Sequence, residues 1–167
     1  MTHRLDDDTL EALAAALEDG ALEDVAKHLP LAHDDRLYLA YLALPRARVE
    51  AFEFLVDQAG LDPDAVYKSA SLLGRAAGHG RLEIVRFLLD RGAGLQGIPL
   101  VRAVQGGNIE IVRLLIEAGA DVNQGRRGFP TPLAMSRTER HPEIEQLLVE
   151  NGATELVGVG DPKARPR

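Results

Sequence analysis

A short segment of this chain recurs along the sequence, and the recurrence limits the folds that are open to it. The segment GRLEIVRFLLDRGA at 80–93 reappears as GNIEIVRLLIEAGA at 107–120 and as RHPEIEQLLVENGA at 140–153, with fainter copies at 47–60 and 20–29. One glutamate marks the register of all copies, at separations of 27, 33, 27 and 33 residues: Glu23, Glu50, Glu83, Glu110 and Glu143. Repeats of this period cannot bury their apolar side chains alone, so the sequence predicts units stacked in one row around a continuous core.

Within each copy, the apolar residues are spaced as on one face of an α-helix. In the copy at 80–93 this face contains Ile84, Val85, Phe87, Leu88 and Leu89. The glutamate falls in the first turn, where the helix dipole favours a negative charge. We expect each helix to end at a glycine in the left-handed conformation, which in the three clearest copies is Gly92, Gly119 or Gly152.

A shorter helix is predicted before each of these helices. Thr131-Pro132-Leu133 is a typical helix start, because Thr accepts a hydrogen bond as N-cap and Pro suits the first helical position. Ser71-Leu72-Leu73 and Ile98-Pro99-Leu100 occupy the equivalent places, and the chain turns between the two helices at Gly80 and Gly107. The predicted unit is thus a short helix, a tight turn, a longer helix and a connection. The connection at 120–130 is long enough for a β-hairpin-like projection.

The runs TPL at 131–133, AA at 76–77 and GNIEIVRLLIEAGADVN at 107–123 resemble the ankyrin repeat. The resemblance is strong over 71–153 and weaker over 11–60. Tetratricopeptide arrays share the helix pair, but the ending Gly-Ala-Asp-Val-Asn is similar to that of ankyrin repeats. The resemblance implies an all-α fold, an ankyrin-like solenoid of about five stacked helix-turn-helix repeats.

We expect a single ankyrin-repeat domain over 1–153, because all units would share one core. Residues 154–167, TELVGVGDPKARPR, lack periodicity and are expected to form a flexible tail. The predicted units cover approximately 11–37, 38–70, 71–97, 98–130 and 131–153.

Some positions depart from the family pattern. The histidine that usually follows TPL is replaced by Gly74, Val101 and Ala134, so we expect its bonds between neighbouring connections to be missing and the units to be less rigidly coupled. Arg140 stands at the inter-helix glycine of the last unit, and Ser136-Arg137 replace its alanine pair. Polar residues at these last places suit a terminal unit that faces water.

The composition excludes several classes of function. The 167 residues contain no cysteine, which excludes disulfide scaffolds, Cys-ligated zinc, iron–sulfur clusters and thiol catalysis. The net charge of −7 argues against nucleic acid as a partner, and no apolar run approaches the roughly 18 residues of a membrane span. The start MTHRLDDD lacks the pattern of a signal peptide. We therefore expect a cytoplasmic protein, and a monomer rather than an oligomer.

Motifs for catalysis or small-ligand binding are weak in this sequence. Residues 92–97 match G-x-G-x-x-G, but a helix precedes them where a nucleotide site needs a strand, so we assign no phosphate role. His33-Asp34-Asp35 could suggest metal ligands, but the spacing of His28 and His33 gives no shared helical face with a third ligand. We predict no metal, no cofactor and no catalytic residue, and hence a protein that is not an enzyme.

The candidate for function is a surface. In the ankyrin resemblance, the short helices and the tips of the connections line a concave face that binds partner proteins. Arg side chains bind carboxylates through two N–H groups, and Tyr and Phe are frequent interface anchors. Carried over by position, the face contains Tyr67, Lys68, Arg75, His79, Arg102, Gln105, Arg126, Arg127 and Phe129.

These residues predict a non-enzymatic protein–protein interaction module whose partner has an acidic or mixed surface. Arg75 and Arg102 stand at equivalent positions of adjacent units and are predicted to form a ladder. Exposed Arg is nevertheless ordinary, because its stem covers apolar helix surface while its charged head stays in water. Two alternatives stay open: a dedicated inhibitor or regulator of one enzyme or toxin, and a small-ligand-binding protein or enzyme with a site between units.

Overall fold

The computed structural model describes residues 4–68, 70–96, 98–125 and 130–155 of the chain. Within these residues it contains ten α-helices and two short strands. The helices are α1 (Asp7–Asp19), α2 (Leu22–Ala26), α3 (His33–Ala43), α4 (Val49–Asp57), α5 (Leu72–Gly78), α6 (Leu82–Asp90), α7 (Pro99–Gln105), α8 (Ile109–Glu117), α9 (Pro132–Thr138) and α10 (Pro142–Glu150). The strands are β1 (Val66–Tyr67) and β2 (Ala70–Ser71).

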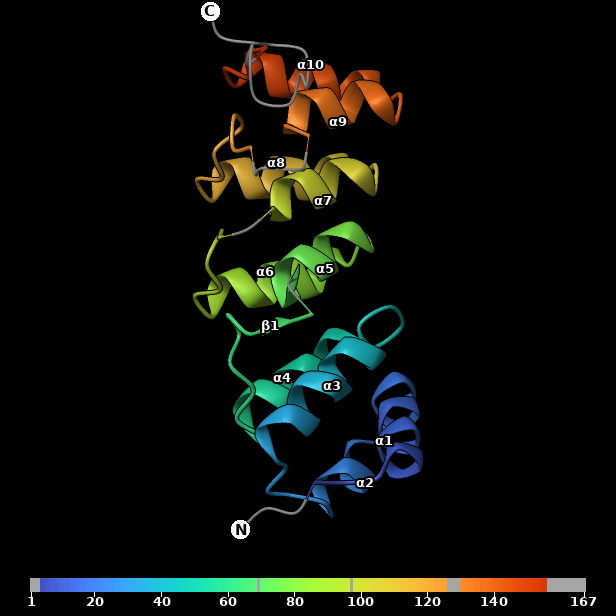
Figure 1. Cartoon of the computed structure of the whole chain (residues 1–167). Helices are drawn as coiled ribbons and strands as arrows, with labels where there is room; N and C mark the ends of the chain where they lie inside the picture. The colour runs from blue at the N-terminus through green and yellow to red at the C-terminus, as the bar shows by residue number, and fades with distance from the viewer. Residues whose placement is uncertain (1–3, 69, 97, 126–129, 156–167) are drawn as a thin grey trace, which may run out of the picture.

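The helices form consecutive pairs, and the pairs are stacked in one row (Figure 1). First helices pack on first helices, α5 on α7 and α7 on α9, while second helices pack on second helices from α4 through α6 and α8 to α10. The N-terminal pair joins the row through α1, which packs on α3. The predicted all-α solenoid of stacked helix pairs is confirmed.

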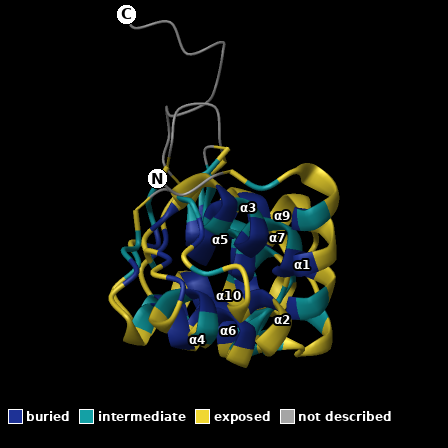
Figure 2. Ribbon diagram, turned by 90° about the horizontal axis from the view of Figure 1, so that it is seen from below, coloured by how far each residue is buried: buried dark blue, intermediate teal, exposed yellow. Residues whose placement is uncertain are grey.

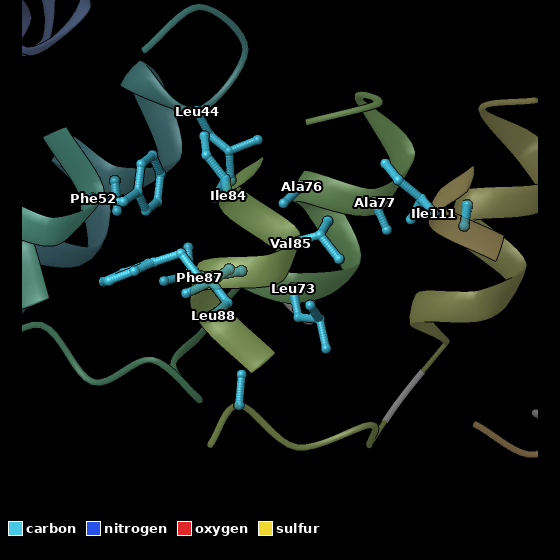
Figure 3. Packing of buried hydrophobic residues seen from close by; sticks show 14 of the residues in the cluster. Leu44, Phe52, Leu73, Ala76, Ala77, Ile84, Val85, Phe87, Leu88 and Ile111 are labelled. Carbon is cyan, nitrogen blue, oxygen red and sulfur yellow. The ribbon is translucent and has the colours of Figure 1, made fainter. Parts of the chain in front are cut away.

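One continuous apolar core runs through the row. Leu17, Phe52, Leu88, Val112 and Leu148 are completely buried, and they come from five different helices along the stack. Viewed along the row, buried residues occupy the middle of the section and exposed residues its outer surface (Figure 2). Labelled side chains of three successive pairs, from Phe52 through Ile84 and Val85 to Ile111, belong to this core (Figure 3). Full burial of a side chain of this size favours folding by about 1.5–3 kcal/mol.

The turns are built on the predicted glycines. Gly92, Gly119 and Gly152 follow α6, α8 and α10 with φ of +86°, +95° and +87°. Gly80 and Gly107, between paired helices, both have φ of +69°. A side chain would crowd the backbone in this left-handed region, which is why the sequence places glycine there. Both sets of predicted glycines are confirmed.

The predicted N-caps also form. The Ser71 hydroxyl accepts a hydrogen bond from the backbone N–H of Gly74 at 3.1 Å, at the start of α5. The Thr131 hydroxyl accepts from the N–H of Ala134 at 3.2 Å, with Pro132 as the first residue of α9. These bonds satisfy helix-end N–H groups that have no partner within the helix.

The first two pairs depart from the predicted unit. Their first helices, α1 and α3, have 13 and 11 residues, whereas their second helices, α2 and α4, have 5 and 9. The order of short then long therefore holds only for the last three pairs. The division predicted between residues 37 and 38 falls inside α3, and the start predicted at residue 11 falls inside α1. The repeated glutamate marks second helices alone, so it gave no information on where the first helices begin.

A β-hairpin occupies the connection between α4 and α5. Its strands are antiparallel, with Val66 opposite Ser71 and Tyr67 opposite Ala70. The hairpin lies between the second and third pairs, where β1 contacts α3 and β2 contacts α5 (Figure 1). The projection predicted for 120–130 includes residues 126–129, which lie outside the described residues.

Neighbouring connections are joined by side chains other than the missing histidines. Asp64 Oδ1 accepts a hydrogen bond from the backbone N–H of Gly94 at 3.0 Å. Asn123 Nδ2 donates to the carbonyl oxygen of Gly152 at 3.0 Å, and Asn123 Oδ1 accepts from the N–H of Thr154 at 2.8 Å. The expectation concerned the bonds of the histidine; at these two places an Asp and an Asn join the connections instead.

One of the polar replacements in the last pair lies in its interior instead of facing water. Ser136 is completely buried, and its hydroxyl donates to the carbonyl oxygen of Leu133 at 2.8 Å. Arg137 is exposed, and it forms ion pairs with Glu145, at 2.7 Å, and with Glu155. The prediction that both replacements face water is therefore wrong for Ser136, because a hydroxyl that bonds to its own helix can be buried.

The backbones of α5 and α7 approach closely at their C-terminal ends. A Cβ atom on Gly106, the C-cap of α7, would lie 2.6 Å from the carbonyl oxygen of Gly78. The opposite side of this contact has room, since a Cβ on Gly78 would lie 3.6 Å from its nearest neighbour, the Cβ of Arg102 in α7. Glycine is thus required at 106 and tolerated at 78.

We expect Gly106→Ala to lower the free energy of unfolding by about 1–3 kcal/mol, because the clash involves backbone atoms and the two helices must separate. Gly78→Ala is the matched control at the same contact. It should leave stability unchanged or raise it by up to about 1 kcal/mol through helix propensity. Urea denaturation followed by far-UV circular dichroism measures both, and equal effects of the two changes would contradict the expectation.

Arg140 occupies the turn between α9 and α10 with φ of +61°, the conformation that glycine adopts in the preceding pairs. We expect Arg140→Gly to raise the free energy of unfolding by about 0.5–1 kcal/mol, because it removes the crowding of a side chain in this region. Arg140→Ala keeps the crowding and should change stability little. Thermal unfolding of the three proteins tests this, and a stabilising Ala variant would show that the arginine side chain itself is the cause.

Candidate functional site

The structure places six of the nine predicted surface residues on the hairpin and on two first helices. Tyr67 lies in β1, and Lys68 follows it. Arg75 lies in α5, with His79 as the C-cap of that helix, while Arg102 and Gln105 lie in α7. The remaining three lie outside the described residues: Arg126, Arg127 and Phe129.

The hairpin brings three tyrosines together. The ring centroids of Tyr41 and Tyr67 are 4.8 Å apart, and those of Tyr38 and Tyr67 are 6.1 Å apart. Both pairs are tilted, at 57° and 52°, an arrangement that aromatic rings prefer over direct stacking. Tyr38 and Tyr41 come from α3 and Tyr67 from β1, so the contact joins segments that are distant in sequence. These are all the tyrosines of the chain.

Two cations lie over the same rings. The Arg75 Cζ is 3.6 Å from the centroid of the Tyr41 ring. The Lys68 Nζ is 5.4 Å from the Tyr41 centroid and 5.3 Å from that of Tyr67. Each such contact is worth about 0.5–2 kcal/mol, depending on its exposure to water. We call Tyr38, Tyr41, Tyr67, Lys68 and Arg75 the tyrosine–cation cluster.

Sequence reasoning found Tyr67, Lys68 and Arg75 and missed Tyr38 and Tyr41. A signal was present, because Tyr38 and Tyr41 are three residues apart and would share one face of a helix. The prediction ended the first unit at residue 37 and placed no helix start there, so that spacing was not used.

Arg102 and Gln105 form a second polar group on α7. The Arg102 guanidinium donates to Gln105 Oε1 at 3.1 Å. Arg75 and Arg102 are each the fourth residue of their helix, and α5 packs directly on α7. The two arginines therefore hold equivalent positions on neighbouring helices, and the ladder between them stays a prediction.

His79 ends α5 beside two positive side chains. Its backbone N–H donates to the carbonyl oxygen of Arg75 at 3.0 Å. Although the residue as a whole is exposed, partial burial of its ring lowers the pKa below the ordinary value of 6.5, and the charges of Arg75 and Arg81 lower this pKa further. The imidazole is therefore held toward its neutral form.

The motifs set aside in the sequence have structural positions. Gly92 is the turn after α6, and Gly94 donates to Asp64, so these glycines belong to the repeat. Asp35 lies in the first turn of α3, is buried, and accepts a hydrogen bond from the backbone N–H of Leu5 at 3.0 Å. Over the described ranges, no group of His, Cys, Asp and Glu has the arrangement of a metal site, and no helix has the length and apolarity to cross a membrane.

A family model of ankyrin repeats, in three copies, matches residues 75–157. The match begins inside α5 and includes α6 to α10, which are the pairs with the short-then-long order. No curated protein sequence matches the chain significantly.

The surroundings of His79 predict a pH effect with a defined sign. Because its folded-state pKa is lowered, the unfolded chain binds more protons as pH falls below about 6.5, so this group makes stability decrease toward acid pH and not toward alkaline pH. We expect an NMR titration of the imidazole to show a pKa below the ordinary value. Arg75→Gln should raise it, whereas Arg86→Gln, an exposed change on α6, should not. A His79 pKa that Arg75→Gln leaves unchanged would contradict this assignment.

Proposed function

The chain belongs to the ankyrin-repeat family over residues 75–157, and from this we propose that it is a non-enzymatic protein–protein interaction module. Ankyrin repeats typically bind proteins and are generally not enzymes. The proposed binding face is formed by the first helices of the pairs and by the hairpin between α4 and α5.

The observation that carries the proposal is the tyrosine–cation cluster. Tyrosine and arginine are the residues most enriched among those that dominate binding energies, because they combine a large contact area with directed hydrogen bonds. Tyr67, Lys68 and Arg75 gather at the hairpin, and Arg102 follows one helix further along the row. Such a set suits a partner that is large enough to touch α5 and α7 at once.

The charge of this face suggests a partner with an acidic surface. The chain as a whole has a net charge of −7, and residues 1–70 contain 15 acidic and 6 basic residues. The proposed face instead carries Lys68, Arg75 and Arg102. A local patch of opposite sign orients an acidic partner and accelerates its association, and salt weakens this effect. Arg126, Arg127 and Phe129 are part of the proposed face on the ground of the resemblance alone.

The test uses two double variants of the full chain with the same change of charge. Arg75→Glu with Arg102→Glu reverses the proposed face. Arg86→Glu with Arg113→Glu reverses two exposed arginines at equivalent positions of the second helices α6 and α8. A partner is first obtained by cross-linking and mass spectrometry in the cells that make the protein, and its affinity for each variant is then measured by calorimetry.

We expect the first double variant to bind at least about tenfold more weakly, which corresponds to about 1.4 kcal/mol, because two attractive charges become repulsive. The second double variant should bind as the unchanged protein does. Circular dichroism establishes that both variants are folded. Equal affinities of the two variants would show that the partner binds elsewhere.

A further inference from the structure

The tyrosine–cation cluster holds two positive charges without a carboxylate. The described part of the chain contains six ion pairs, and neither Lys68 nor Arg75 takes part in any of them. The Arg75 Nε is buried and has no hydrogen-bond partner among the described residues. Other arginines of the array do have acceptors: Arg91 bonds to Asp57, and Arg81 bonds to the carbonyl oxygens of Pro45 and Ala47.

The rings hold these cations but leave their hydrogen-bonding capacity unused. A guanidinium that lies flat on an aromatic ring contacts it through its face, whereas its N–H groups point outward in its own plane. The Arg75 Cζ lies over the Tyr41 ring at 3.6 Å from its centroid, a distance that suits such an arrangement. Lys68 is exposed at the turn of the hairpin, with φ of +48°, a backbone conformation uncommon for residues with side chains.

We propose that the tyrosine–cation cluster binds a carboxylate side chain of the partner protein, an Asp or Glu flanked by an apolar residue. This inference rests on the proposed function and specifies the chemistry of the partner. The carboxylate accepts hydrogen bonds from the guanidinium of Arg75 and pairs with the ammonium of Lys68. One negative charge thereby relieves two neighbouring positive charges.

The apolar flank follows from what surrounds the cations. The side chains of Tyr38, Tyr41 and Tyr67 are only partly buried, so part of their apolar ring surface is open to solvent. The rings of Tyr41 and Tyr67 lie under the cations, and Tyr38 packs on Tyr67. An apolar side chain next to the carboxylate would cover this surface and exclude water from the ion pairs, which strengthens them.

A carboxylate suits the cluster better than a phosphate does. Phosphate sites in proteins combine several cations with backbone N–H groups at a helix N-terminus or a glycine-rich loop. Here the donors are two side chains, and tyrosine rings form the rest of the surroundings. A carboxylate needs no backbone donors, because its two oxygens can accept hydrogen bonds from one guanidinium and one ammonium.

The tyrosines provide the readout for the test. The chain has three tyrosines, all in the cluster, and no tryptophan, so its intrinsic emission reports on this site alone. The probes are hexapeptides without Tyr or Trp that contain one Glu between Leu or Val residues, the same peptides with Gln in place of Glu, and inorganic phosphate. Each is titrated into the full chain at low salt.

We expect the Glu peptides to change the emission saturably and to bind about tenfold more tightly than the Gln peptides. Lys68→Gln should weaken Glu-peptide binding about three- to tenfold and leave Gln-peptide binding unchanged. Lys68 is exposed on the hairpin, so this change spares the core. Arg86→Gln on α6 removes an exposed positive charge elsewhere and should have no effect.

Three results would overturn the inference: equal binding of Glu and Gln peptides, absence of a saturable change with every peptide, or phosphate binding tighter than that of the Glu peptides. The double variants described under the proposed function distinguish a failure of the interaction face from a failure of the carboxylate site. One outcome is that Arg75→Glu with Arg102→Glu abolishes partner binding, while Lys68→Gln leaves the affinity for the Glu peptides unchanged. This outcome supports the interaction face and contradicts the carboxylate site. If the affinity for the partner is also unchanged by Arg75→Glu with Arg102→Glu, both the interaction face and the carboxylate site are contradicted.

Discussion

Each inner helix pair of this protein has two apolar sides that only its neighbours can cover. Phe52 of α4, Ile84 of α6 and Ile111 of α8 have at most 1 % of their surface exposed because a pair lies on either side of each. The spacing of the row is therefore fixed by side-chain size, and small residues are needed where backbones meet. Gly106 is such a place, where α7 touches α5. The same regular spacing brings Arg75 and Arg102 to equivalent positions on neighbouring helices.

The last three helix pairs and their turns could be predicted from the sequence, because each of the signals that define them involves residues close together in the chain. The spacing of apolar residues defines a helix face, Thr131 with Pro132 defines a helix start, and Gly80 defines a turn. Each signal involves residues within a few positions of one another. The second pair was located less well, since α3 lacks such a start: Ala32, the N-cap of α3, makes no side-chain bond to the helix. A start was present at α1, where the Asp6 side chain accepts a hydrogen bond from the N–H of Thr9, but the predicted first unit began only at residue 11.

The candidate site could be predicted only in part, for a physical reason. Family position suggested Tyr67, Lys68 and Arg75 one by one, but their environment depends on Tyr41, which belongs to the preceding pair. Contacts of this kind are set by how two pairs stack, and no short-range pattern encodes them. The hydrogen bonds by which Asp64 and Asn123 join neighbouring connections were not predicted either, because their partners lie about 30 residues away in the sequence.

The hairpin lies at the boundary between two kinds of unit, with longer first helices before it and shorter ones after it. Tyr41 stands on one side of that boundary and Arg75 on the other, and the Arg91–Asp57 ion pair crosses the same joint. In a linear array, stability is the sum of the units and of the interfaces between nearest neighbours. A molecule seated on both sides of one joint strengthens that joint alone. A ligand bound to the cluster would therefore make the units before and after the hairpin unfold more cooperatively.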